Sequence, residues 1–141
     1  MTAYTLSLGL VIVVFSIWIS ICDIKSMAIN NFLFLACNLC AVTVQFVFNF
    51  EYVWINLLSA LIFGAVYFIV RKITRNKLGM GDVWFGVFQG LCLVPKMLPV
   101  CLGVETVLAF VVMGRRMKKG EKFPFIPFMS FALFISFIIC L

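Results

Sequence analysis

The chain contains 141 residues, of which 65% are hydrophobic and 11% are charged, and its mean hydropathy is +1.23. A soluble domain is about 45–50% apolar and about 25% charged, and a chain of 16.0 kDa cannot bury two thirds of its side chains. The composition therefore excludes both a soluble globular protein and a disordered one. It predicts an integral membrane protein.

Apolar residues run continuously through the chain, as in Leu6–Ile21, whereas the strands of membrane barrels alternate apolar and polar residues. The predicted fold class is therefore all-α, a single polytopic transmembrane domain over residues 1–141. The chain has no His, which removes the usual ligand of zinc proteases and of haem. The net charge of +6 lies in short clusters between apolar runs, where basic residues set membrane topology, so nucleic acid is not an expected partner.

Six apolar segments follow one another along the chain. A membrane-spanning helix needs about 20 apolar residues, with a range of about 17–25. The region Asp82–Gly114 exceeds one span and is interrupted by Pro95, Lys96 and Pro99, and because proline breaks helices we divide this region in two. The predicted helices are Tyr4–Cys22, Asn31–Phe50, Tyr52–Val70, Val83–Val94, Leu98–Gly114 and Phe123–Leu141.

The basic residues favour six spans. With six helices, ten of the eleven Lys and Arg residues fall on one side of the membrane, and only Lys96 faces the other side. Basic loops stay in the cytoplasm, so we expect a multi-pass protein of the inner (plasma) membrane with both termini outside. The basic loops are expected to bind anionic lipid headgroups. They carry Lys25, Arg71, Lys72, Arg75, Lys77, Arg115, Arg116, Lys118, Lys119 and Lys122.

Two of the five acidic residues are predicted at the cytoplasmic ends of helices. Asp23 ends the first helix and Asp82 begins the fourth, so the two carboxylates can meet across the bundle at one depth. Such a pair can share one proton, and this is how aspartic proteases activate water against a peptide carbonyl. Taken singly, Asp82 is equally well explained as a helix N-cap and Asp23 as a solvated boundary residue. The helix dipoles favour the charged form at Asp82 and the neutral form at Asp23.

Three short motifs accompany these aspartates. Asp82 closes the sequence Gly-Met-Gly-Asp that starts at Gly79, Asp23 is followed by Ile-Asn-Asn at residues 29–31, and Pro-Phe-Ile-Pro-Phe occupies residues 124–128. In this order and on six helices, the motifs resemble those of the type IV prepilin peptidases, the GxGD-type intramembrane aspartyl proteases. That family has an Asp followed by Ile-Pro-Asn, then GxGD, then Pro-Phe-x-Pro-Phe, and the resemblance covers nearly the whole chain.

The resemblance implies an activity and a set of site residues. It implies an aspartic endopeptidase that removes the short basic leader from type IV prepilins, pseudopilins or related pilin-like substrates at the cytoplasmic face, with Asp23 and Asp82 as the catalytic residues. No metal ion and no organic cofactor is expected, because the two carboxyl groups supply both acid and base. The motif residues that would support the site are Gly79, Gly81, Ile29, Asn31, Pro124, Phe125 and Pro127.

The chain departs from the family pattern at three positions. Asn30 replaces the Pro of Ile-Pro-Asn, Trp84 stands where many members carry a Lys, and Ile126 replaces the Gly between the two Pro-Phe pairs. The zinc-binding CxxC domain of the long, bifunctional members is not expected here, and neither is their N-methyltransferase activity. The chain resembles the short, peptidase-only form found with tight-adherence pilus systems, or the archaeal preflagellin peptidases.

Glu105 belongs to none of these motifs. It is predicted near the middle of the fifth helix, and an acidic residue at that depth is a functional candidate by default. One interpretation of Glu105 is a protonated side chain bonded to a neighbouring helix. Glu105 also motivates an alternative function for the whole protein, a small proton-coupled transporter or channel subunit. A third function to be considered is a non-catalytic membrane assembly factor. Separate replacement of Glu105 and Asp82 would discriminate among these functions. The sequence leaves the identity of the substrate and the oligomeric state open.

Overall fold

The computed structural model describes residues 3–26, 30–74, 78–116 and 124–140, with residues 113–116 as backbone only. Within these ranges every regular element is helical, which confirms the predicted all-α class. The α-helices are α1 (Ala3–Ser26), α2 (Asn31–Phe48), α3 (Val53–Ile73), α4 (Met80–Cys92), α5 (Leu98–Arg116) and α6 (Ile126–Cys140). Two short 3-10 helices, η1 (Phe50–Tyr52) and η2 (Pro95–Met97), precede α3 and α5.

The helix boundaries near the two aspartates differ from the predicted ones. α1 continues beyond its predicted end, so Asp23 lies within the last turn of the helix rather than after it. α4 begins three residues before its predicted start, so Gly81 belongs to its first turn. The earlier start of α4 has a local cause. The Gly79 N–H donates a hydrogen bond of 2.9 Å to the Asp82 side chain, and a side chain that reaches back in this way starts a helix.

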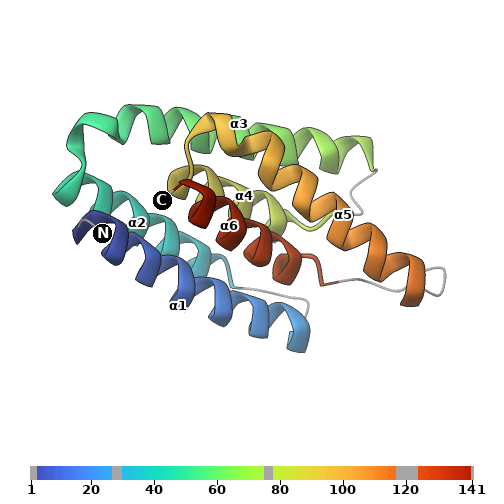
Figure 1. Cartoon of the computed structure of the whole chain (residues 1–141). Coiled ribbons are helices and arrows are strands. Elements are labelled where there is room, and N and C mark those ends of the chain that lie inside the picture. The colour runs from blue at the N-terminus through green and yellow to red at the C-terminus, as the bar shows by residue number, and fades with distance from the viewer. Residues whose placement is uncertain (1–2, 27–29, 75–77, 117–123, 141) are drawn as a thin grey trace.

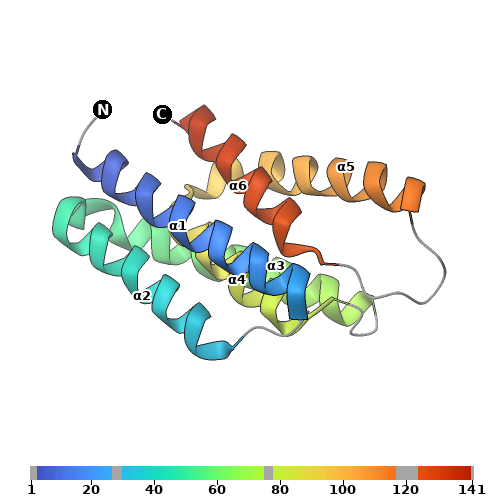
Figure 2. The same ribbon diagram turned by 90° about the horizontal axis from the view of Figure 1, so that it is seen from below.

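The described helices form a bundle in which α4 lies inside (Figure 1). α4 packs against α2, α3 and α6, and nine of its 13 residues are buried. α5 packs on α6 and stands apart from α1 and α2 (Figure 2). Both views place the two chain ends at the same end of the bundle. Side chains on α4 are therefore positioned by three neighbouring helices.

The outer faces of the bundle are apolar. Leu10, Trp54 and Phe110 are 66%, 73% and 79% exposed, and lipid accommodates such surfaces whereas water does not. The chain is a multi-pass membrane protein, because four segments of the described residues are long and apolar enough to cross a bilayer by length and composition. These segments are Ala3–Ser26, Asn31–Phe48, Phe50–Ile73 and Pro95–Val112.

Glycines let α3 and α4 approach each other closely. A Cβ atom at Gly90 would lie 2.4 Å from the Cα atom of Ala60, and a Cβ atom at Gly86 would lie 2.1 Å from the ring of Tyr67. Both distances are too short for any larger residue. Small residues four positions apart allow such contacts between membrane helices, where close van der Waals packing stabilises association. The glycines therefore fix the height of α4 against α3.

The C-terminal end of α4 is buried, and side chains of two neighbouring helices satisfy its carbonyl groups. Gln45 of α2 donates to the carbonyl oxygen of Leu91. Ser59 of α3 donates to the carbonyl oxygen of Leu93 over 2.7 Å. An unpaired buried carbonyl group would cost about 1–3 kcal/mol, so these two side chains allow the helix to end inside the bundle.

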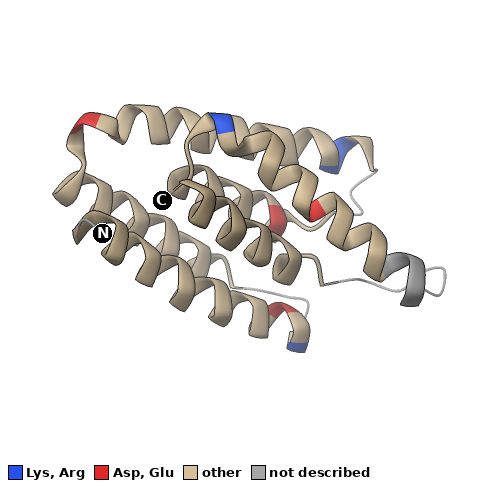
Figure 3. Cartoon of the chain, in the orientation of Figure 1, with Lys and Arg blue, Asp and Glu red and all other residues tan. Residues whose placement is uncertain are grey.

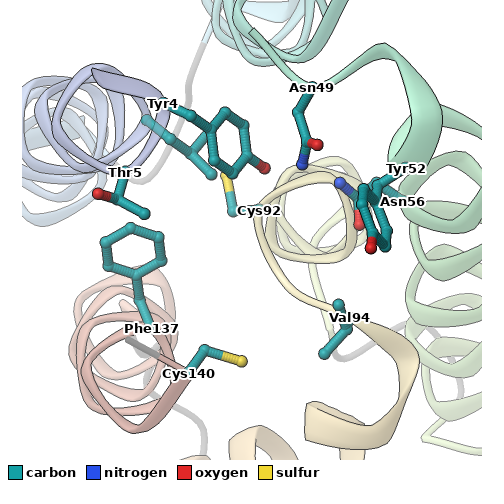
Figure 4. Close-up of a pocket in the computed structure, with 10 residues that line it drawn as sticks. Tyr4, Thr5, Asn49, Tyr52, Asn56, Cys92, Val94, Phe137 and Cys140 are labelled. Atoms are coloured by element: carbon teal, nitrogen blue, oxygen red, sulfur yellow. The ribbon is translucent and has the colours of Figure 1, made fainter. Parts of the chain in front are cut away.

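A cavity of about 160 Å³ lies over this end of α4 (Figure 4). Cys92 lines the cavity from α4, Tyr4 from α1 and Phe137 from α6. α4 has 13 residues and is shorter than α1, α2 and α3. Neither Asp23 nor Asp82 lines the cavity, so it is separate from the predicted site.

Candidate active site

Asp23 lies in the last turn of α1, and its side chain is 9% exposed. Its Oδ2 atom accepts a hydrogen bond of 3.3 Å from the backbone N–H of Ile126. Ile126 is the first residue of α6, and the N–H groups of a first helical turn have no partner within their own helix. The N-terminus of α6 therefore offers Asp23 a free donor and the positive end of a helix dipole.

Asp82 lies in the first turn of α4, and its side chain is 8% exposed. Its Oδ2 atom accepts the bond from Gly79, the residue in the N-cap position. The interpretation of Asp82 as the N-cap is therefore wrong: Gly79 holds that position, and Asp82 accepts its N–H from the third position inside the helix. The bond fixes the orientation of the carboxyl group at the start of a buried helix.

Asp23 lies within electrostatic range of Asp82. Figure 3 shows acidic residues, coloured red, on both α1 and α4. The sequence predicted that only Asp82 faces the positive end of a helix. In the structure Asp23 also faces a positive helix end, because the N-terminus of α6 contacts it. The helix dipoles therefore make a smaller difference than predicted between the two carboxyl groups in their preference for the charged form.

Ile126 connects the surroundings of the two aspartates. Its N–H binds Asp23, and its Cδ1 atom lies 3.9 Å from the position that a Cβ atom at Gly81 would take. The ring of Phe34, from the first turns of α2, lies 3.2 Å from the same position. The structure therefore brings the Gly-Met-Gly-Asp motif and the Pro-Phe motif together beside both aspartates.

The predicted Pro-Phe residues shape the start of α6. Pro124 and Phe125 precede the helix, and the Phe125 carbonyl accepts bonds of 3.1 and 3.3 Å from the N–H groups of Phe128 and Met129. Pro127 is the second residue of the helix, where its missing N–H costs no hydrogen bond. This segment sets where α6 begins, and thus where its first N–H meets Asp23.

The Ile-Asn-Asn motif lies at the start of α2. Asn30 is the N-cap, and its side chain accepts a bond of 3.1 Å from the N–H of Phe32. Asn31 is the exposed first residue of the helix, and Ile29 lies outside the described residues. Phe34, which follows the motif on α2, has its ring against α4 at Gly81.

Replacing Gly81 with Val is expected to lower the peptidase activity that the motif resemblance implies by about 10²-fold, the effect of a misplacement of roughly 1 Å. Even a single Cβ atom there would lie 3.2 Å from the Phe34 ring, and the two branches of Val need more space still. The first turn of α4 must then move while Asp82 stays chemically intact. Cleavage rates in proteoliposomes measure the effect, with Gly103→Val as the control because no atom lies within 4 Å of that position. Wild-type activity in Gly81→Val would refute the close packing.

A family model described as the type IV leader peptidase family matches residues 10–141. The match includes both aspartates and all three motifs. The chain belongs to the type IV leader peptidase family. No curated protein and no solved structure matches it. The resemblance seen in the motifs is thereby confirmed, and membership of this family makes the chain a membrane peptidase.

This leader peptidase has a cation within electrostatic range of Asp82, although position 84 holds Trp. Trp84 is 42% exposed, while Arg71, in the last turn of α3, lies within electrostatic range of Asp82. The guanidinium group of Arg71 also contacts the Sδ atom of Met80 at 2.7 Å. Among the described residues, no group of three His, Cys, Asp or Glu side chains could hold a metal ion.

Glu105 is 1% exposed, and both of its carboxyl oxygens are hydrogen-bonded. Tyr67 of α3 donates to Oε2, and Gln89 of α4 donates to Oε1 over 2.6 Å. Glu105 is therefore bonded to neighbouring helices, as one of the interpretations drawn from the sequence has it. Membership of the leader peptidase family favours a protease over a transporter. Sequence reasoning missed Tyr67 and Gln89. The available signal was a Gln two helical turns after Asp82 in an otherwise apolar helix.

Proposed function

We propose that this peptidase is an aspartic endopeptidase that cleaves the short basic leader from type IV prepilins, pseudopilins or related pilin-like substrates. Asp23 and Asp82, the aspartate pair, are its catalytic residues. The observation that carries the proposal is the arrangement of two buried carboxyl groups on α1 and α4, each bound by a backbone N–H at a helix N-terminus. The reaction needs no metal ion and no organic cofactor.

The aspartate pair holds one proton in the resting enzyme. The ionised carboxyl group takes a proton from water, whose oxygen bonds to the scissile carbonyl carbon, while the protonated carboxyl group gives its proton to the carbonyl oxygen. One hydroxyl of the resulting diol then returns a proton to the pair, and the pair protonates the leaving nitrogen as the C–N bond breaks. The pair ends with one proton, as it began.

The substrate reaches the pair from the bilayer. An apolar helix that follows the leader enters between the protease helices from the side, so that the scissile bond lies at the depth of the aspartate pair. The basic loops repel a basic leader and instead bind anionic lipid headgroups. We place the protein in the inner (plasma) membrane because its basic residues gather in loops on one side, as in proteins whose basic loops stay in the cytoplasm.

The direct test is cleavage by the purified chain in proteoliposomes. The substrate is a synthetic polypeptide with a short basic leader joined to an apolar helix, and mass spectrometry of the products locates the cut. We expect a single cut between leader and helix, at a rate that excess EDTA leaves unchanged. A rate that EDTA abolishes and an added divalent metal restores would contradict the metal-free mechanism.

We further propose six membrane spans with both termini outside. Lys25 lies in the last turn of α1 and Glu51 lies in η1, so they mark opposite ends of the bundle, and a Cys at either position tests the orientation. In a chain without its native cysteines, we expect a membrane-impermeant thiol reagent to label Lys25→Cys only from the cytoplasmic side and Glu51→Cys only from the outside. Labelling of position 25 from the outside would refute this topology.

A further inference from the structure

We propose that Glu105 is a positioning residue. Together with Tyr67, Gln89 and the carbonyl group of Met129 it forms a polar junction, the name used below for these four groups. The polar junction sets the height and rotation of α4 against the first turn of α6, and through these two helices the relative position of the aspartate pair. This inference rests on the proposed function for its effect on catalysis.

Gln89 is the centre of the polar junction. Its side-chain amide has two hydrogens, and it donates to Glu105 Oε1 over 2.6 Å and to the Met129 carbonyl oxygen over 3.0 Å. Both Gln89 and Glu105 are at most 1% exposed, so no solvent competes for these bonds. The amide therefore joins α4 to α5 and α6 at one point.

Gln89 joins α4, which carries Asp82, to α6, whose first N–H binds Asp23 of α1. Asp82 lies on α4 two helical turns before Gln89, and residues seven apart lie on nearly the same face of a helix. On α6, Met129 lies three residues after Ile126, whose N–H binds Asp23. One side-chain amide thus fixes the distance along the bundle between the two carboxyl groups.

Glu105 orients this amide from a fixed position of its own. The Tyr67 hydroxyl donates to Oε2 of Glu105, and the Tyr67 ring lies over Gly86 of α4, where a Cβ atom would be 2.1 Å from it. The Cys101 thiol contacts Oε1 at 3.5 Å. Glu105 is therefore held between α3 and α4. It acts on the aspartate pair indirectly, through the positions of α4 and α6.

A carboxyl group suits this position because it offers two acceptor oxygens to two donors on different helices. Glu105→Gln retains one acceptor oxygen, so one bond must change: either the Tyr67 hydroxyl turns to accept from the new amide, or one Gln89 N–H loses its partner. Glu105→Leu retains none and leaves both donors unpaired in a dry interior, where unpaired polar groups are costly. The two substitutions should therefore have graded effects.

The test compares two buried glutamines. Gln89→Leu removes the polar junction's centre, and Gln45→Leu removes a bond of the same kind that joins α4 to α2 and not to α6; both side chains are 0% exposed. We expect both variants to lose thermal stability, but only Gln89→Leu to lose kcat, by about 10²-fold, with KM within about threefold of wild type. Equal kcat in the two variants would overturn the proposal.

The graded series provides a second measurement if Gln89→Leu fails to fold. We expect kcat to fall in the order wild type, Glu105→Gln, Glu105→Leu, with KM nearly constant. Wild-type kcat in folded Glu105→Leu would show that the polar junction does not position the aspartates.

A third measurement is independent of proteolysis. Ser20 of α1 and Ser130 of α6 have their Oγ atoms 3.0 Å apart, and Ser130 follows Met129 directly, so a disulfide between Ser20→Cys and Ser130→Cys reports the position of the first turns of α6. Peptide mass spectrometry identifies this cross-link with the native cysteines in place. We expect Gln89→Leu, and not Gln45→Leu, to slow its formation.

The cross-link separates the two proposals. If the wild-type chain cleaves no leader while Gln89→Leu still slows the cross-link, the proposed function is wrong and the polar junction stands. If Gln89→Leu leaves the rate of cross-linking unchanged, the polar junction does not hold α6, whatever the chain cleaves.

Discussion

Replacing Asp82 with Asn is expected to lower the rate of leader cleavage by about 10²–10⁴-fold, the usual contribution of a general acid or base. Asn has nearly the same size, and its side-chain oxygen can still accept the Gly79 N–H that starts α4. The variant therefore keeps the helix and loses only the ability to exchange a proton. The same reasoning applies to Asp23→Asn, whose oxygen can still accept the N–H of Ile126.

Initial rates in proteoliposomes measure this loss, and thermal unfolding in detergent verifies that each variant is folded. Glu51→Gln is the matched control, because it makes the same chemical change at an exposed acid in η1. We expect the control to cleave at the wild-type rate. A folded Asp82→Asn variant with a rate within about twofold of wild type would remove Asp82 from the mechanism.

The largest loss of stability is expected for Gly90→Ala. In a helix interior, Ala is favoured over Gly by about 1 kcal/mol, so propensity alone predicts stabilisation. Packing decides otherwise, because the added Cβ atom would lie 2.4 Å from the Cα atom of Ala60 and 2.6 Å from the Ser59 carbonyl oxygen. Backbone atoms cannot rotate away, so α3 and α4 must separate. Overpacking of this kind costs about 1–3 kcal/mol or more.

Gly103→Ala is the control for this prediction. It makes the same substitution in α5, where no atom lies within 4 Å of the new Cβ atom. Thermal unfolding in detergent should show Gly90→Ala less stable than wild type and Gly103→Ala equal or more stable. If both variants unfold at the wild-type temperature, the close contact between α3 and α4 is not present in the protein.

Much of the fold follows from short-range properties of the sequence. Continuous apolar runs predict helices because every backbone group in a bilayer must be satisfied within its own segment, and the helices of the structure match the predicted ones to within a few residues. The three motifs were enough to predict the family, which the family model confirms. The boundary error near Asp82 arose because the side-chain bond of Asp82 to the backbone of Gly79 extends α4 beyond its apolar run.

The contacts between distant segments could not be predicted. The bond from Ile126 to Asp23 joins residues 103 positions apart, and no periodicity in either helix indicates it. The sequence marked Glu105 as unusual from its depth alone, but its partners depend on which face of α5 meets α3 and α4. Gly86, which admits the Tyr67 ring and so completes the polar junction, has a role that only the packed helices reveal.

The most direct test of the central claim is a comparison of cleavage rates in Asp23→Asn, Asp82→Asn and the double variant. Residues that act as one unit have non-additive effects. If the two carboxyl groups share one proton in one reaction, each single variant already falls to the rate of the double variant. Two single losses that multiply in the double variant, or either folded single variant cleaving at nearly the wild-type rate, would contradict a catalytic aspartate pair.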